Sequence, residues 1–178
     1  MLENIKNIDF LVLNFIRDNF SNDFLDFLMP KITVLGNGGA IWIIATIVLL
    51  MIPKYRKGGK AMLAGLVAVL IIGNITLKPL IGRVRPYDLI DGIELLIAAP
   101  SDYSFPSGHT LSSFVAAFIL SMIDKRFAYI AIPLAVLIAF SRLYLYVHFP
   151  SDVLGGIIIA ALISAVVYLI FFKKKSSH

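Results

Sequence analysis

The sequence predicts an all-α protein: a polytopic membrane bundle of five to six transmembrane helices with amphipathic N-terminal helices. Three observations predict this class. The 178 residues are 59% hydrophobic and 15% charged, and the mean hydropathy of +0.89 is far above that of soluble domains. Uncharged runs long enough to cross a bilayer recur along the chain. The length suits one domain, residues 1–178, and no repeat or linker divides it.

Residues 1–31 form an amphipathic N-terminal segment rather than a signal peptide, because acidic residues interrupt them and leave no long apolar core. Two apolar helical faces are formed by Ile5, Ile8, Val12, Phe15 and Ile16, and by Phe20, Phe24, Phe27 and Leu28. Such faces suit helices that lie in the membrane interface. One tilted extra span is the alternative.

The helical bundle core, residues 32–172, contains five predicted crossings. Four are nearly uncharged runs, at residues 32–53, 61–77, 103–122 and 153–172. The fifth, residues 127–147, is interrupted only by Arg142. We therefore expect five crossings.

Basic residues collect on one side of this predicted bundle. They lie in one loop at Lys54, Arg56, Lys57 and Lys60, in another at Lys125 and Arg126, and in the tail, residues 173–178. The positive-inside rule makes this side and the C-terminus cytoplasmic. The connection 83–106 and the turn 147–150 then lie outside, as does the N-terminus. This is the pattern of a multi-pass protein of the cell (cytoplasmic) membrane.

Composition excludes several classes of function. The chain has no cysteine, which excludes disulfides, thiolate catalysis and cysteine-ligated zinc. Its net charge of +5 does not indicate a nucleic-acid partner, because the basic residues lie mainly in loops between spans. The bilayer itself is the predicted surrounding.

Three polar segments interrupt the apolar chain: K-P-L-I-G-R-V-R-P at 78–86, P-S-G-H at 106–109 and S-R-L-Y-L-Y-V-H-F-P-S-D at 141–152. Charged groups at membrane depth are costly and indicate function. At 1.5 Å per helical residue, each segment lies roughly 22–32 Å from the basic end of its span. That is the outer boundary of a hydrocarbon core about 30 Å thick. We therefore expect one site on the outer side.

The first two segments favour phosphate binding. Lys78, Arg83 and Arg85 place three cations near a helix break at Gly82, an arrangement that binds polyanions; the alternative is basic residues that snorkel at a span end. Ser107 is a candidate N-cap whose helix would present free amides to a phosphate. His109 follows directly, placed to protonate a leaving oxygen. An ordinary capped helix with an interfacial histidine is the alternative.

The third segment favours nucleophilic chemistry. Arg142 precedes His148, and Asp152 follows His148 by four residues. A carboxylate at that spacing can accept the Nδ1 proton and leave Nε2 free as a nucleophile. The alternative is that Asp152 serves only as a partner of the helix dipole and His148 as an interfacial polar residue.

His109, His148 and Asp152 could in principle ligate a metal. The neighbouring basic residues would oppose a divalent cation and favour an anion. We therefore expect no metal and no cofactor, and activity in the presence of a chelator.

The three segments together resemble the motif of the type-2 phosphatidic acid phosphatase family. The pattern reads K-x6-R-P from Lys78, P-S-G-H from Pro106 and S-R-x5-H-x3-D from Ser141. Every motif position is filled, in order, over residues 78–152. The resemblance implies the family's helical bundle and a lipid phosphatase.

The resemblance also implies roles. The phosphoryl oxygens would be held by Lys78, Arg85, Ser107, Gly108 and Arg142. His148 would form a phosphohistidine, Asp152 would orient it, and His109 would protonate the leaving group. Arg83 is not a motif position, so it is expected only as an auxiliary phosphate ligand.

The implied substrate is a lipid phosphate or diphosphate. As a small family member with an extracytoplasmic site, this chain most resembles undecaprenyl diphosphate phosphatases, which recycle the carrier lipid of the cell wall. A phosphatidylglycerophosphate or phosphatidate phosphatase is the alternative. A transporter fits less well, because transporter sites lie near the bilayer midplane between repeats. A non-catalytic lipid-binding protein would have little use for both histidines and the aspartate. Vanadium-dependent haloperoxidases have a similar motif, but they are soluble and much longer, which argues against oxidation chemistry in this chain. The sequence indicates no oligomeric state.

Overall fold

The computed structural model describes residues 2–173, which form helices joined by turns and one long loop, with no strand in this range. The all-α membrane fold is thus confirmed. The helices are α1 (Leu2–Phe20), α2 (Asp23–Leu35), α3 (Ala40–Met51), α4 (Arg56–Ala68), the π-helical η3 (Val69–Leu77), α5 (Lys78–Ile81), α6 (Gly108–Ile123), α7 (Lys125–Tyr144) and α8 (Pro150–Phe171). Short 3-10 turns are η1 (Asn37–Gly39), η2 (Pro53–Tyr55) and η4 (Pro86–Asp88). Residues 174–178 of the predicted basic tail lie outside the described range.

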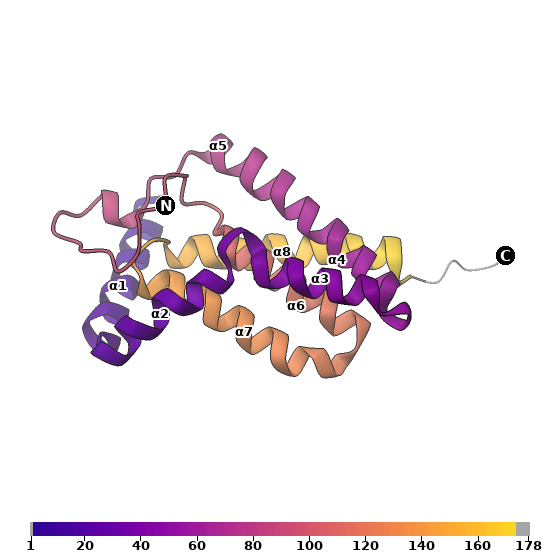
Figure 1. Ribbon diagram of the computed structural model, residues 1–178. Coiled ribbons are helices and arrows are strands. Elements are labelled where there is room, and N and C mark those ends of the chain that lie inside the picture. Colours follow the sequence, from indigo (N-terminus) through magenta and orange to yellow (C-terminus); the bar gives the residue numbers. More distant parts are fainter. Residues whose placement is uncertain (1, 174–178) are drawn as a thin grey trace.

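Helix α6 is the centre of the bundle. Figure 1 shows α3, α4, α7 and α8 running lengthwise around it. Every side chain of α6 from Thr110 to Ala117 is buried. Polar groups inside this helix are therefore paired with protein, as where the Trp42 indole donates to Ser113 Oγ at 2.9 Å. This explains why α6 carries more Ser, Thr and His than its lipid-facing neighbours.

Close helix approach depends on residues that lack a side chain. A Cβ atom added at Gly65 of α4 would lie 2.6 Å from the Ile119 side chain of α6. One added at Gly156 of α8 would lie 3.3 Å from the Ser107 carbonyl oxygen. Small residues at such crossings allow membrane helices to pack by van der Waals contact, which replaces the hydrophobic effect as their driving force. The two contacts hold α4 and α8 against α6.

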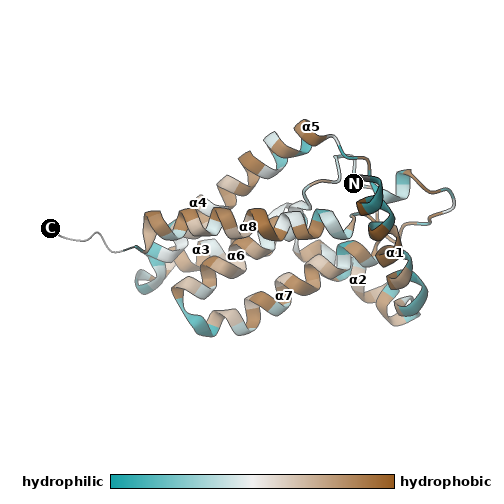
Figure 2. Cartoon of the chain, turned by 180° about the vertical axis from the view of Figure 1, so that it is seen from behind, coloured by the Kyte–Doolittle hydropathy of each residue, from teal (hydrophilic) through white to brown (hydrophobic). Residues whose placement is uncertain are grey.

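The helices of the bundle are largely hydrophobic along their length, and hydrophilic residues gather towards the two ends (Figure 2). Three helical segments are long and apolar enough to cross a membrane: Pro53–Asp88, Lys125–Tyr144 and Pro150–Phe171. Asp23–Leu35 and Asn37–Met51 meet at a bend of 43° and together form a fourth candidate. The apolar helix Gly108–Ile123 is shorter. The count of five crossings therefore stays a prediction.

Several boundaries differ from those predicted. The third span was expected from residue 103, but α6 begins at Gly108, because residues before it form a loop in which the Ser104 amide donates to the Arg83 carbonyl. The predicted border between residues 31 and 32 lies within α2, which continues to Leu35 and packs against α7. The expected helix break at Gly82 is present, with φ of 59°.

The two ends of the bundle differ in character. The turn between α3 and α4, the turn between α6 and α7, and the end of α8 lie at one end of the bundle (Figure 1). The loop that follows α5, together with α1, lies at the other end. The basic residues of the two predicted cytoplasmic loops thus lie at one end. The three polar segments, with Lys78, Arg83, Arg85 and Arg142, lie at the opposite end. Which end faces the cytoplasm stays a prediction.

Helix α1 packs against α7 and α8 at the loop end. In the predicted apolar face, Ile5, Ile8 and Phe15 are 42%, 59% and 58% exposed. Asp9 and Leu13, in contrast, are buried against the bundle. Most of the predicted apolar face is therefore turned outwards, as in a helix that lies in a membrane interface.

Candidate active site

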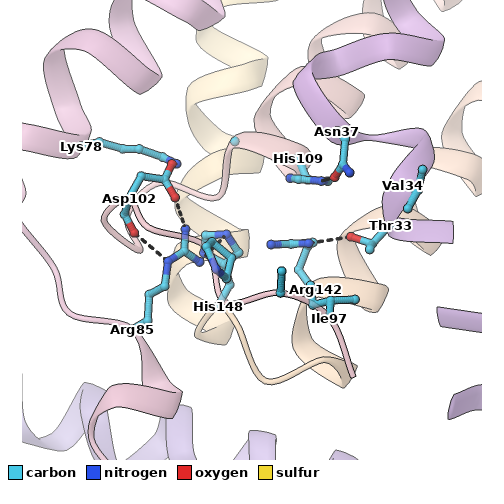
Figure 3. A pocket seen from close by; sticks show the side chains of 13 residues that line it. Thr33, Val34, Asn37, Lys78, Arg85, Ile97, Asp102, His109, Arg142 and His148 are labelled. Atoms are coloured by element: carbon cyan, nitrogen blue, oxygen red, sulfur yellow. Dashed lines mark hydrogen bonds and ion pairs between the residues drawn. The ribbon is translucent and has the colours of Figure 1, made fainter. Parts of the chain in front are cut away.

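The three polar segments meet around one cavity of about 470 Å³ at the loop end of the bundle. The cavity is lined by six of the predicted site residues: Lys78, Arg85, Gly108, His109, Arg142 and His148. Figure 3 shows Lys78 and Arg85 on one side, Arg142 on the other and His148 between them. The loop between α5 and α6, the start of α6 and the α7–α8 turn thus bring together residues up to 70 positions apart.

The cavity is strongly cationic. Lys78, Arg85 and Arg142 are only 7%, 3% and 3% exposed. Arg142 Nη1 donates to Thr33 Oγ1 at 2.6 Å, whereas its Nε has no hydrogen-bond partner among the described residues. A buried donor without a partner is costly. One buried donor of the Arg142 guanidinium is thus left without a protein partner among the described residues.

Asp102, which the sequence reasoning missed, neutralises part of this charge. Its carboxylate forms ion pairs with Lys78 and, at 2.6 Å, with Arg85. Arg85 Nε also donates to the Asp102 carbonyl oxygen at 2.7 Å. Burial raises the pKa of Asp102, but the bonds from Lys78 and Arg85 outweigh this effect and lower the pKa to about 2. The carboxylate gives these two cations the oxygen partners that a phosphate would otherwise supply (Figure 3).

The surroundings of His148 determine which ring nitrogen carries the proton. Arg85 Nη1 lies 3.3 Å from Nε2, and a guanidinium can only donate. Nε2 must therefore accept, and Nδ1 must carry the proton. On that side lie Ser104 Oγ at 3.4 Å and Asp152 Oδ2 at 3.6 Å. The lone pair of Nε2 thus faces the cationic cavity.

His148 is neutral at physiological pH. It lies in the turn between α7 and α8 and is 1% exposed. Burial lowers its pKa to about 3; Arg85 and Arg142 also lower it, and Asp152 opposes them. A neutral imidazole with an unprotonated Nε2 is the form that can act as a nucleophile.

Asp152 is fully buried and holds the turn that carries His148. Its Oδ2 accepts hydrogen bonds from Ser104 Oγ at 2.6 Å and from the Phe149 amide at 2.8 Å. The second bond caps the first turn of α8, where a negative charge also favours the helix dipole. Both sequence interpretations of Asp152, as partner of His148 and as first-turn acid, therefore have a geometric basis.

His109 lies on the α6 side of the cavity, beneath the turn between α2 and α3. Its Nε2 lies 2.9 Å from Asn37 Oδ1. A Cβ atom at Gly36 would be 2.6 Å from the His109 ring, so the absence of a side chain there lets the turn approach. Asn37, also missed by the sequence reasoning, fixes this histidine.

Two predicted phosphate ligands are not among the cavity-lining residues of the described chain. Arg83 points behind the site and pairs with Asp152 and Asp9 at 2.5 and 2.7 Å. Ser107 occupies the N-cap position, but within the described residues its side chain makes no capping bond. Its Oγ instead accepts from Thr110 Oγ1 at 3.0 Å, and the residue is fully buried. Protein partners thus hold both side chains in this structure, and their roles as phosphate ligands stay predictions.

A second, more apolar groove of about 520 Å³ meets the cavity. The residues that line both are Lys78, Asp102, Gly108 and His109. Away from them the groove runs along α3 and α4, between side chains such as Ile43, Ile47, Leu50, Leu63 and Leu70. An apolar chain in this groove would place its end group at the cations.

Comparisons with known proteins agree with the motif. A family model described as the PAP2 superfamily matches residues 59–176. An undecaprenyl-diphosphatase of Sulfolobus acidocaldarius is 34% identical over 125 residues, which are 70% of this chain and 60% of the relative's length. A lipid A 4'-phosphatase of Porphyromonas gingivalis is 29% identical over 99% of this chain and 76% of the relative. The chain thus spans less than two thirds of the Sulfolobus protein.

Solved structures are similar over almost the whole chain. A PAP2-type phosphatidylglycerolphosphate phosphatase of Bacillus subtilis superposes with a TM-score of 0.74 at 28% identity, covering 98% of this chain and 90% of that one. Aquifex aeolicus LpxE superposes with a TM-score of 0.73 at 29% identity, covering 90% and 94%. Because the family match extends over well over half of the sequence and the fold agrees, this chain belongs to the PAP2 superfamily.

Proposed function

We propose that this PAP2 superfamily member is a membrane lipid phosphatase that works through a phosphohistidine at His148. The observation that carries the proposal is the cavity in which Lys78, Arg85 and Arg142 surround the unprotonated Nε2 of His148. Buried cations around a neutral nucleophile suit a phosphoryl group, whose negative charge they bind and whose transition state they stabilise. The apolar groove suits a substrate with a lipid tail.

The first step forms one bond and breaks one. His148 Nε2 attacks phosphorus with its lone pair, and Arg85 turns from Nε2 to a phosphoryl oxygen. The P–O bond to the alcohol or phosphate leaving group breaks, and His109 gives that oxygen a proton. Asp152 stabilises the positive charge that develops on the His148 ring, through Nδ1.

The second step restores the enzyme. Water attacks the phosphohistidine, His109 takes up the water proton as a base, and the N–P bond breaks to release phosphate. Lys78, Arg142 and the start of α6 at Gly108 hold the phosphoryl oxygens in both steps. The cycle needs only these side chains and water, with no metal or other cofactor.

The substrate class is a lipid phosphate or diphosphate. We propose undecaprenyl diphosphate as the first candidate, because a relative with 34% identity is named undecaprenyl-diphosphatase. Phosphatidylglycerophosphate or phosphatidate is the alternative, supported by the similarity to the Bacillus subtilis phosphatase. The lipid A phosphatases among the relatives add a third class. The cavity residues would contact only the phosphate group, so selection among these lipids depends on the residues that line the apolar groove.

The orientation belongs to the same proposal. The basic loops gather at the end of the bundle opposite the cavity (Figure 1). Under the positive-inside rule this end, and the C-terminus with it, is cytoplasmic. The cavity then opens at the extracytoplasmic face, where a lipid of the outer leaflet reaches it.

A phosphate-release assay tests the function. Purified protein is mixed with vesicles that contain undecaprenyl diphosphate, phosphatidylglycerophosphate, phosphatidate or lipid A, each with and without EDTA. We expect release from at least one lipid, unchanged by EDTA. Release that EDTA abolishes and a divalent metal restores would contradict the metal-free cycle.

The nucleophile is tested in the same assay. His148→Ala should lower turnover by at least about 10³-fold, and rapid quenching should trap acid-labile phosphate on the wild type but not on this variant. Tyr129→Ala, at a site that is 82% exposed on α7, is the matched control for purification. Unchanged release by His148→Ala would remove the proposed nucleophile.

A further inference from the structure

Arg83 lies directly behind the pair formed by His148 and Asp152. Its Nη1 donates to Asp152 Oδ1 at 2.5 Å and to Ser151 Oγ at 2.7 Å. Its guanidinium also stacks over the Phe149 ring, with 4.1 Å from Cζ to the ring centroid. Arg83 thus holds the residues on both sides of Pro150, where the His148 turn passes into α8.

Asp9 of helix α1 holds Arg83 in turn. Asp9 Oδ2 accepts from Arg83 Nη2 at 2.7 Å and from Ser151 Oγ at 2.5 Å. Its Oδ1 accepts from the Ser151 amide at 2.9 Å. Asp9 is 2% exposed, although α1 is otherwise largely exposed on its apolar face. A buried carboxylate is costly unless it is paired. Here Asp9 is paired with Arg83 and Ser151, which hold the turn that carries His148.

The two carboxylate oxygens of Asp152 have different partners. Oδ1 faces Arg83, and Oδ2 faces His148, Ser104 and the Phe149 amide. The rotation of the carboxylate is therefore fixed from both sides. The charges also matter: Asp9 cancels the charge of Arg83, so the group of three presents a net single negative charge to His148.

We propose that Arg83 is a positioning residue that acts through Asp152, and that Asp9 makes helix α1 part of this support. The inference rests on the proposed roles of His148 and Asp152. When His148 becomes phosphorylated its ring gains positive charge, and the fixed Asp152 Oδ2 must meet Nδ1 at that moment. Without Arg83 the Asp152 carboxylate would rotate more freely and would be aligned with His148 Nδ1 for a smaller fraction of the time. The cavity that binds phosphate would be unchanged.

A double-mutant cycle on single-turnover phosphoenzyme formation tests the proposal. Arg83→Met should slow phosphorylation by about 10- to 100-fold with little change in KM. In an Asp152→Asn background the same substitution should have almost no further effect, because the residue through which it acts is already lost. Asp9→Asn should slow the step in the same way, to a smaller extent.

Three comparisons make the result decisive. Arg126→Met removes an arginine that pairs with Asp124 at 2.7 Å on an exposed turn, and it should leave the rate unchanged. Arg83→Lys, which keeps the charge, should recover part of the rate lost in Arg83→Met and replaces it in the cycle if Arg83→Met fails to fold. Thermal unfolding in detergent reports folding for each variant.

The outcomes separate this inference from the proposed function. If His148→Ala forms phosphoenzyme at the wild-type rate, the assignment of the nucleophile fails. If His148→Ala is inactive but Arg83→Met is as fast as the wild type, the positioning role alone fails. Equal losses from Arg83→Met in the wild-type and Asp152→Asn backgrounds, or a change in KM only, would also overturn it.

Discussion

The residues of the site divide into those that face the cavity and those that hold them from behind. His148 illustrates the division, because Arg85 lies at its Nε2 and Asp152 at its Nδ1. Arg142 lines the cavity, and Thr33 holds its Nη1. Contacts from behind the cavity thus fix the orientation of both side chains.

The buried state of His148 predicts a pH response. Its folded pKa of about 3 is below the ordinary histidine value of 6.5, so the unfolded chain binds a proton in this range that the folded chain does not. The free energy of unfolding should therefore fall as pH drops from 6.5 towards 3, and should be fully retained above 6.5. In ¹⁵N NMR of the protein in micelles, the His148 ring should not titrate between pH 7.5 and 5.

A matched variant separates this effect from acid denaturation in general. His148→Gln should lose less thermal stability between pH 7.5 and 5 than the wild type does. The chain has only three histidines, which makes the assignment of the ring signals direct. A His148 titration with a midpoint near 6.5 would contradict the prediction.

Asp102 predicts a gain of affinity on substitution. Asp102→Asn removes the carboxylate that pairs with Lys78 and Arg85 but keeps a similar shape. Orthovanadate or phosphate should then inhibit at about tenfold lower concentration, because the lost competitor is a carboxylate 52% exposed to solvent, whose ion pairs are worth about 1.4 kcal/mol. Asp88→Asn, on η4, serves as the control. Weaker inhibition of Asp102→Asn would show that Asp102 orders the cations rather than competes for them.

The sequence predicted the cavity residues well because the signal was physical: charges within an apolar chain. The roles of Arg83 and Ser107 as phosphate ligands stay predictions, because neither residue lines the cavity and protein partners already hold both side chains. Asp102 and Asn37 lie in a loop and a turn, where polar residues are ordinary and carry no signal. Asp9 did have a signal, because it interrupts an apolar run as the three polar segments do. A lone carboxylate on an apolar face of α1 indicates a buried polar contact for the same reason that the three polar segments do.

Among the elements, α1 combines an exposed apolar face with a buried acid. These features are compatible with a helix that lies in the membrane interface, as the sequence predicts. The alternative prediction is that α1 crosses the membrane. The two arrangements differ in depth along the helix. An interfacial helix keeps all turns of its exposed face at one depth, and a spanning helix does not.

Site-directed spin labelling decides between them. Ile8→Cys and Phe15→Cys, both at exposed positions, introduce single labels because the chain has no cysteine. Power-saturation measurements in bilayers should place both labels at one shallow depth. A difference near the roughly 10 Å that separates seven helical residues would indicate a crossing.

For the whole molecule, the central α6 and the surrounding helices place the basic turns at one end and the cavity at the other. The helix ends were predicted less well than the helices, as at residue 103, because loop hydrogen bonds set the start of α6. The direction of the bundle in the membrane stays a prediction that rests on the positive-inside rule.

Labelling of intact cells tests this direction. Glu94→Cys, on the loop beside the cavity, should react with a membrane-impermeant maleimide from outside. Lys54→Cys, exposed at the opposite end, should react only after permeabilisation. The reverse pattern would invert the proposed orientation.

The cavity and the groove share Lys78, Asp102, Gly108 and His109. A lipid headgroup can then reach the cations sideways, with its tail never leaving the bilayer. For such an enzyme the relevant concentration is the substrate's mole fraction in the membrane. Adding inert lipid at constant total substrate should slow turnover in proportion to this two-dimensional dilution, while a larger assay volume should leave the rate per vesicle unchanged.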